Sequence, residues 1–282
     1  MISVGSKSTL QVSAKVPAGL LLTDGENEVL LPNKFVPTDA KEGTNIEVFV
    51  YTDSEDRPVA TTQEPHAMVG DFACLKVVDT SAHGAFLDWG LDKDLFVPKS
   101  EQHQPLQVGR SYVVAVFLDN ATNRVAAASR LGEFLDYDVS GVNTGARVKL
   151  LVYGFTDRGA QVLVDNKHSG LIFESETFRR LNIGDKLSGY VAAVRPDNKL
   201  DIQLQRTGAG GNADARAIVL RALEENGGRL ELGDRSPPEK IYEQLGLSKK
   251  AFKAIIGGLY KEGLLVLSPL EVQQKEPDKG SR

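Results

Sequence analysis

The chain has 282 residues, of which 41% are hydrophobic and 25% charged, as expected for a globular protein with room for about two to four small domains. Its one cysteine, Cys74, excludes an intramolecular disulfide and a cysteine-based zinc site. The sequence contains no run of about 18 apolar residues that would predict a membrane span. No apolar stretch of the kind found in a secretory signal follows Met1, so we expect a cytoplasmic protein.

The net charge of −5 hides a difference between the two halves of the chain. Residues 1–140 carry 11 basic and 20 acidic residues, whereas residues 141–282 carry 22 and 18. A polyanion is repelled least by the C-terminal half, so phosphate contacts are expected there. Ordinary variation of a protein surface stays open as the other explanation.

The first unit, residues 1–64, is predicted to be a small β-barrel. Short apolar runs separated by turn residues predict five strands, over residues 9–14, 19–23, 29–32, 46–51 and 59–62. The second of these, Gly19-Leu20-Leu21-Leu22, offers no aromatic side chain. We therefore expect a structural role for this barrel.

The second unit, residues 65–132, repeats the plan. Its strands are expected over residues 72–78, around Gly84–Gly90, and over 94–98, 113–118 and 124–129. Strand alternation places Ala85, Leu87 and Trp89 in the core. It leaves Phe72 and Phe86 outside, where they face solvent, a ligand or a neighbouring domain.

Exposed aromatic rings on a small barrel suit stacking of unpaired bases. We therefore assign RNA contacts in the second unit to Phe72 and Phe86, with His83 in the preceding loop as a further stacking residue. Lys76 and Arg124 are expected to contact phosphates. Packing of the two Phe rings on a neighbouring domain, and a simply solvated His83, stay open.

The third unit, residues 141–206, follows an acidic connector over residues 131–144 that has room for a short helix. Its strands are expected over residues 147–153, 159–165, 169–173, 186–194 and 199–205. Repetition of one plan at this spacing predicts an array of like domains rather than one large sheet.

At Thr207 the pattern changes. Residues 207–212 have the composition of a flexible linker. The apolar period then becomes helical, and helices are predicted from Ala217 to Asn226, from Ser236–Pro237 to Leu245, and from a Ser248 cap to Glu262. With β-like runs at 229–232 and 264–267, residues 212–271 have the element order of a winged helix-turn-helix. We expect residues 272–282 to form a disordered tail.

Three short motifs point to a known family. Gly84-Ala85-Phe86-Leu87-Asp88 resembles the second strand of S1 RNA-binding domains, a subclass of the oligonucleotide-binding fold. Pro98–Glu101 and Gly170–Glu176 resemble the segment after the third strand of that family. Three S1-like units followed by a winged helix resemble the conserved virulence factor B family of bacteria, also called YitL-like proteins. The resemblance implies RNA binding and a role in regulating gene expression.

The expected fold is thus mainly β with an α+β C-terminal domain: three S1-like oligonucleotide-binding-fold barrels of five strands each, then the winged helix-turn-helix. The third barrel departs from the S1 pattern, because Arg158 and Gln161 stand where aromatic residues are usual. We expect it to bind a nucleic-acid backbone through Arg147, Lys149, Arg158, Lys167 and Lys199, with Phe173 as its aromatic residue. Ordinary solvated charges are the alternative.

In the winged helix, Lys249, Lys250 and Lys253 lie on one flank of the third helix near its N-terminus, where a recognition helix enters a groove. No Asn, Gln or Arg lies between residues 249 and 261 to read base edges. The lysines supply charge but little sequence code, so binding of RNA or of a protein partner is favoured over sequence-specific DNA reading.

We find no constellation that predicts an enzyme. The four histidines are scattered, and neither a phosphate-binding loop, a dinucleotide fingerprint nor a nucleophile elbow is present. We therefore expect no catalytic site, no metal and no cofactor.

The leading hypothesis is a non-catalytic protein that binds single-stranded RNA by base stacking and phosphate contacts and regulates gene expression post-transcriptionally. Two other hypotheses stay open. One is a DNA-binding transcription regulator that uses the winged helix. The other is a protein–protein adaptor whose partners belong to the ribosome or the RNA-decay machinery.

Overall fold

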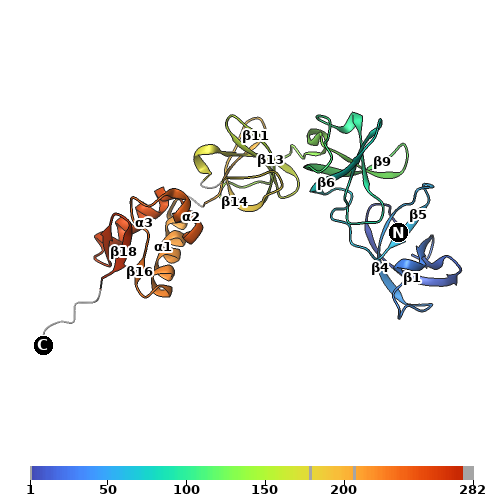
Figure 1. The fold of residues 1–282 in the computed structure, drawn as a ribbon, viewed down its shortest axis with the longest axis horizontal. Helices are drawn as coiled ribbons and strands as arrows, with labels where there is room; N and C mark the ends of the chain where they lie inside the picture. The colour runs from blue at the N-terminus through green and yellow to red at the C-terminus, as the bar shows by residue number, and fades with distance from the viewer. Residues whose placement is uncertain (1, 178–179, 206–207, 276–282) are drawn as a thin grey trace. The chain divides into compact units, whose positions relative to one another are not determined.

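The computed structural model describes residues 2–177, 180–205 and 208–275. They form three closed five-stranded β-barrels and a C-terminal domain of three helices and a small sheet, which confirms the predicted fold class (Figure 1). The chain divides into two compact units, residues 1–135 with two barrels and residues 136–282 with the third barrel and the winged helix.

The first barrel contains β1 (Lys7–Val16), β2 (Gly19–Thr23), β3 (Glu28–Pro32), β4 (Asn45–Thr52) and β5 (Pro58–Thr61), with a 3-10 turn, η1 (Asn33–Phe35), after β3. Hydrogen bonds join the strands in the order β1-β2-β3-β5-β4, and β4 closes the barrel on β1. Alternate residues such as Leu10, Val12 and Leu22 fill the interior.

The second barrel repeats this order with β6 (Phe72–Thr80), β7 (Gly84–Leu87), β8 (Leu95–Pro98), β9 (Ser111–Asp119) and β10 (Arg124–Ala128), and η2 (Lys99–Glu101) follows β8. The connector after β10 begins with the 3-10 turn η3 (Leu131–Phe134), a short helix of the kind expected there.

The third barrel consists of β11 (Arg147–Thr156), β12 (Gly159–Val164), β13 (His168–Phe173), β14 (Lys186–Val194) and β15 (Leu200–Gln203), with η4 (Glu174–Glu176) after β13. Each barrel has a β-bulge in its first strand, at Val12/Ala14, Val77/Asp79 and Val152/Gly154. The bulge bends the strand, so that its first half pairs with the fourth strand and its second half with the second strand.

The winged-helix domain comprises α1 (Gly208–Glu225), β16 (Arg229–Leu230), α2 (Pro238–Leu245), α3 (Lys249–Lys261), β17 (Leu265–Ser268) and β18 (Glu271–Gln274). The Oγ of Ser248 accepts a hydrogen bond from the backbone N–H of Ala251 at 3.0 Å, as the predicted cap requires. The predicted apolar face of α3 is buried: Phe252, Ile255, Ile256 and Leu259.

Two expectations for this region are corrected. The segment expected to be a linker is largely helical, because α1 begins at Gly208; once a helix is nucleated, each further residue adds a hydrogen bond. The tail expected to be disordered from residue 272 contains most of β18, whose pairing with β16 and β17 satisfies its backbone groups. Thr207 of the linker and residues 276–282 of the tail lie outside the described residues.

Candidate nucleic-acid interface

The outer face of the second and third strands is the surface on which oligonucleotide-binding folds usually hold their ligand. Strand register identifies one equivalent pair of outward positions in each barrel. The pairs are Leu21–Leu30, Phe86–Phe96 and Gln161–Leu171. Only the second barrel has aromatic rings at both positions, so it alone presents a platform of two rings there.

Phe86 on β7 and Phe96 on β8 form this platform. Their ring centroids are 5.2 Å apart with an interplanar angle of 42°, and both side chains are half-buried. Phe96 lies against Gly84, where an added Cβ would stand 2.7 Å from a ring carbon of Phe96. Two rings held against the strand backbone offer exposed faces to an incoming base at little further loss of side-chain freedom.

The sequence prediction did not include Phe96, although the alternation of Leu95-Phe96-Val97 indicates that its side chain points outward. Leu95 and Val97 are buried, which turns Phe96 outward. The prediction grouped Phe72 with Phe86 as outward stacking residues, but the register separates them. Phe72 pairs with Ala115 of β9, whereas Phe86 pairs with Asp79, seven residues further along β6. Phe72 is half-buried and lies outside the platform.

One edge of the platform is acidic. Asp88 and Asp94 flank β7 and β8, and Asp79 lies opposite Phe86. Burial, followed by the charges of Asp88 and Asp79, raises the pKa of the Asp94 carboxyl. Phosphates are repelled from this edge.

The other edge carries His83 and Lys99. Both side chains are exposed, and the backbone N–H of Lys99 donates to the carbonyl of His83 at 3.0 Å, which holds the β7 loop beside η2. A nucleic-acid backbone therefore meets the more favourable charge on this side. Lys99 is a second residue that sequence patterning did not single out as a contact.

The other two predicted contacts of the second barrel lie away from the platform. Lys76 is exposed on β6 opposite Ser111 of β9. Arg124, at the start of β10, forms an ion pair with Asp56 of the first barrel. This ion pair offsets part of the charge that Arg124 would present to a phosphate.

The predicted residues of the third barrel fall into separate groups. Arg158 and Phe173 are neighbours, because Gly159 pairs with Phe173 and the N–H of Glu174 donates to the carbonyl of Arg158 at 3.1 Å. Phe155, 52% exposed at the same end of β11, adds an aromatic ring that the sequence prediction omitted.

Arg147 and Lys149 are exposed on the first half of β11, where it pairs with β14. Arg158 lies in the turn after β11, beyond the bulge at Val152/Gly154, where the strand pairs with β12. Lys199 lies exposed in the turn between β14 and β15. These cations therefore do not converge on one phosphate.

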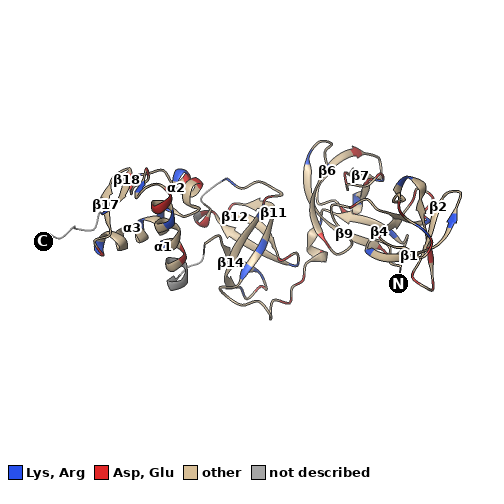
Figure 2. Cartoon of the chain, turned by 90° about the horizontal axis from the view of Figure 1, so that it is seen from below, with Lys and Arg blue, Asp and Glu red and all other residues tan. Residues whose placement is uncertain are grey.

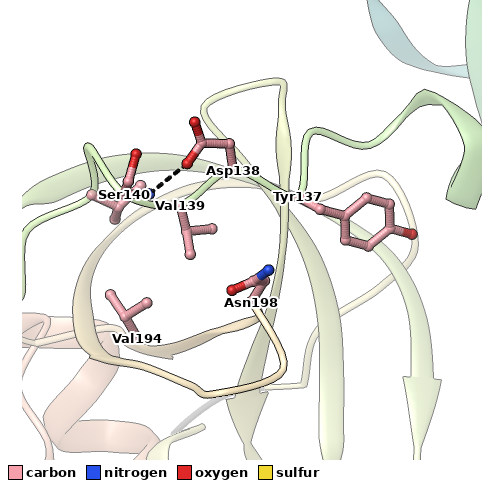
Figure 3. Close-up of a pocket in the computed structure, with 7 residues that line it drawn as sticks. Tyr137, Asp138, Val139, Ser140, Val194 and Asn198 are labelled. Carbon is pink, nitrogen blue, oxygen red and sulfur yellow. Dashed lines mark hydrogen bonds between the residues drawn. The ribbon is translucent and has the colours of Figure 1, made fainter.

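A pocket of about 580 Å³ lies beside the turn that carries Lys199 (Figure 3). It is lined by Tyr137, Asp138, Val139, Ser140, Val142, Val194 and Asn198. Val139 and Val194 point toward one another, whereas the ring of Tyr137 points away. The Asp138 carboxylate accepts a hydrogen bond from the N–H of Ser140 at 3.0 Å.

On the winged helix, Lys250 and Lys253 are exposed and Lys249 is half-buried. The ammonium of Lys253 lies 3.7 Å from the Asp234 carboxylate. The flank of α3 is therefore less positive than the sequence suggests.

Among the described residues, no group of three or more His, Cys, Asp or Glu side chains has the arrangement of a metal site. Within the same residues, no helix is both long and apolar enough to cross a membrane.

Two family models match the chain. The S1 domain model matches residues 4–63 and 69–129, which cover the first and second barrels. The model of the CvfB-like winged helix domain matches residues 217–273. Both describe domain types that bind nucleic acid.

The chain is also similar to whole proteins. It is 29% identical to YitL of Bacillus subtilis over 271 residues, covering 92% of this chain and 89% of YitL. It is 25% identical to conserved virulence factor B of Staphylococcus aureus over 277 residues, covering 93% and 91%. A crystal structure of a multidomain protein with nucleic acid binding domains from Streptococcus pneumoniae matches with a TM-score of 0.44 and 21% identity, covering 96% of this chain and 98% of that one.

Proposed function

The chain belongs to the family of conserved virulence factor B and YitL-like proteins, and from this premise we propose that it is a non-catalytic protein that binds single-stranded RNA. The observation that carries the proposal is the Phe86–Phe96 platform on the ligand-binding face of the second S1 barrel. Unpaired bases stack on such rings whatever their sequence.

RNA is favoured over duplex DNA because the rings can stack only on bases that are not already stacked in a helix. His83 and Lys99 lie on the platform edge that phosphates can approach. The third barrel adds Arg158 and Phe173, with Phe155 beside them, at the loop where oligonucleotide-binding folds extend their site.

We propose that the three barrels have different roles. Leu21 and Leu30 offer the first barrel no stacking surface, and its outward Phe49 is buried against the second barrel, so its role is structural. The second barrel stacks bases, and the third contacts the backbone. By occupying a transcript without cleaving it, such a protein regulates gene expression post-transcriptionally.

The test is the affinity of the full-length protein for labelled single-stranded RNA, with duplex DNA measured in parallel. Phe86→Ala and Phe96→Ala are each expected to weaken RNA binding by about 1–3 kcal/mol, the contribution of one stacked base. Leu21→Ala, at the equivalent position of the first barrel, is the matched control and leaves affinity unchanged.

Thermal unfolding of each variant is the control that tests whether the barrel remains folded. Preference of the wild-type protein for duplex DNA favours the transcription-regulator alternative, and binding to neither ligand favours the protein adaptor. Wild-type affinity in both Phe variants, with the protein folded, rules out the platform.

A further inference from the structure

We propose that the face formed by β11 and β14 on the third barrel is a second binding site, which holds the phosphate backbone of single-stranded RNA through Arg147, Lys149 and Lys186. The inference rests on the proposed function, because it assigns a further contact to the same ligand. The site combines Arg147 and Lys149, which were predicted from the sequence, with Lys186 and Tyr190. All four residues lie on a different face of the barrel from that of β12 and β13.

Strand register brings these side chains onto one surface, called here the β11–β14 patch. Arg147 lies opposite Tyr190, Lys149 opposite Ser188, and Leu151 opposite Lys186. Lys149 is central, since directly opposite Cβ atoms are about 4.5–5.5 Å apart and diagonal ones about 7–8 Å.

The phase of β14 follows from Gly189, the residue between Ser188 and Tyr190. An added Cβ at Gly189 would lie 2.7 Å from the Cδ1 of Leu150, so this position points into the barrel. Its neighbours on β14 therefore point outward.

The cations of the patch are exposed, and none belongs to an ion pair found among the described residues. Figure 2 marks the Lys and Arg positions along the chain in blue. Two neighbouring carboxylates accept hydrogen bonds from backbone groups. Asp165 accepts a hydrogen bond from the N–H of Lys149 at 2.7 Å, and Asp185 accepts one from the N–H of Asn182 at 3.0 Å. The ammonium and guanidinium groups are thus available to phosphate oxygens.

In the first barrel, the residues of the same face are already engaged in an ion pair and in packing against the second barrel. There Lys7 stands in the place of Arg147 and Phe49 in the place of Tyr190. The Lys7 ammonium pairs with Glu64 at 2.8 Å, and Phe49 is buried against Trp89. A surface that serves interdomain packing in the first barrel has its charge neutralised and its aromatic ring covered.

In the second barrel the equivalent face carries one exposed cation, Lys76, opposite Ser111, and its other two pairs are largely apolar. Phe72 lies opposite Ala115 and Cys74 opposite Val113, and both β9 residues are buried. Of the three barrels, only the third combines three exposed cations on this face. That charge fits a polyanion better than an apolar protein surface.

The patch is expected to bind without regard to sequence, because it presents charge and one half-buried ring, Tyr190, but few groups that read base edges. Its signature is therefore the dependence of affinity on salt. Each phosphate contact to a single strand contributes a slope of about 0.7 in a plot of log affinity against log salt.

The experiment measures binding of the full-length protein to a single-stranded RNA of about 20 nucleotides, long enough for more than one barrel, from about 50 to 200 mM salt. Lys186→Ala is expected to lower the slope by about 0.7, and the combination of Arg147→Ala, Lys149→Ala and Lys186→Ala by about 2. Lys186→Arg keeps the charge and is expected to keep the slope. Lys15→Ala, an exposed strand lysine of the first barrel, controls for loss of charge elsewhere.

An unchanged slope in the triple variant, with the wild-type protein binding RNA, overturns the patch and leaves the Phe86–Phe96 platform standing. That outcome is also expected if the patch serves a protein partner. Absence of RNA binding by the wild-type protein overturns the proposed function itself, and the patch with it. A normal slope in Phe86→Ala, with reduced affinity, shows that the two sites act separately.

Discussion

Gly84 has no side chain, and the ring of Phe96 occupies the space beside it. A Cβ at this position would stand 2.2 Å from the carbonyl oxygen of Val97 and 2.7 Å from the ring of Phe96. The position of Phe96, and through it the contact with Phe86, therefore depends on the absence of one methyl group.

We expect Gly84→Ala to lower the free energy of unfolding by about 1–3 kcal/mol, because the methyl group overpacks β7 against β8. It also displaces Phe96 and weakens RNA binding. Chemical denaturation and RNA titration of the same sample measure both effects.

Gly141→Ala is the control, since nothing lies within 4 Å of a Cβ at that position. It is expected to change stability by no more than about 0.5 kcal/mol. If Gly84→Ala leaves stability and affinity at wild-type values, the ring of Phe96 is not held by this contact.

At the level of elements, the outer face of β4 joins the first barrel to the second. Phe49 and Trp89 meet edge to face with ring centroids 5.4 Å apart, and Tyr51 and Val59 belong to the same buried cluster. The indole N–H of Trp89 donates to the carbonyl of Ala67 at 2.7 Å. Trp89 is thus buried as its strand phase predicted, but at a junction between two barrels.

Trp89→Ala is expected to destabilise the protein by about 3–5 kcal/mol, because it removes a large buried ring and leaves the Ala67 carbonyl without its donor. Circular dichroism during thermal unfolding measures the loss. Trp89→Phe retains much of the packing and should lose less. Equal stability of Trp89→Ala and the wild type would contradict a shared core.

For the molecule as a whole, ion pairs occur in both units. In the first, Lys7, Lys34 and Arg124 pair with acidic residues, and the Lys34–Asp92 and Arg124–Asp56 pairs join the two barrels. In the third barrel, the cations of the β11–β14 patch have no such partners among the described residues. Elsewhere in the second unit, Arg195, Arg216, Arg229 and Lys253 do form ion pairs, so the patch is distinguished by its own cations, which are unpaired within the described part of the chain.

The acidic partners predict a dependence of stability on pH. Hydrogen bonding to Lys34 lowers the pKa of Asp92, and hydrogen bonding to Lys7 lowers the pKa of Glu64. A lowered pKa in the folded state contributes stability above the unfolded pKa, near 4, and loses it as pH falls through the folded value. The urea midpoint, followed by fluorescence of the single tryptophan, Trp89, is expected to fall below about pH 4.

The double variant Asp92→Asn with Glu64→Gln isolates these two groups. It should show a shallower decline with acid than the wild type, because two of the titrating carboxylates are gone. An identical decline would mean that other carboxylates account for the acid sensitivity. Both pairs are exposed, so added salt should reduce the difference.

The local sequence pattern was sufficient to predict most of the strands and helices. Alternation of apolar residues and the turn residues between them predicted the strands of all three barrels to within a few residues, and Ser248 predicted the start of α3. These features depend on neighbours in the sequence, which is why they can be predicted from it. β18 was missed, since its short polar sequence is ordered by its partner strands rather than by its own preference.

The surface arrangement depended on contacts between distant residues. That Phe86 meets Phe96 rather than Phe72, that Arg124 faces Asp56, and that Lys186 joins Lys149 are consequences of strand register and of packing between barrels. A one-residue shift of register would reverse every side chain on a strand, so alternation alone assigns a residue to the outside of a barrel without saying which face it shares. The composition of each binding face is therefore a property of the closed barrel.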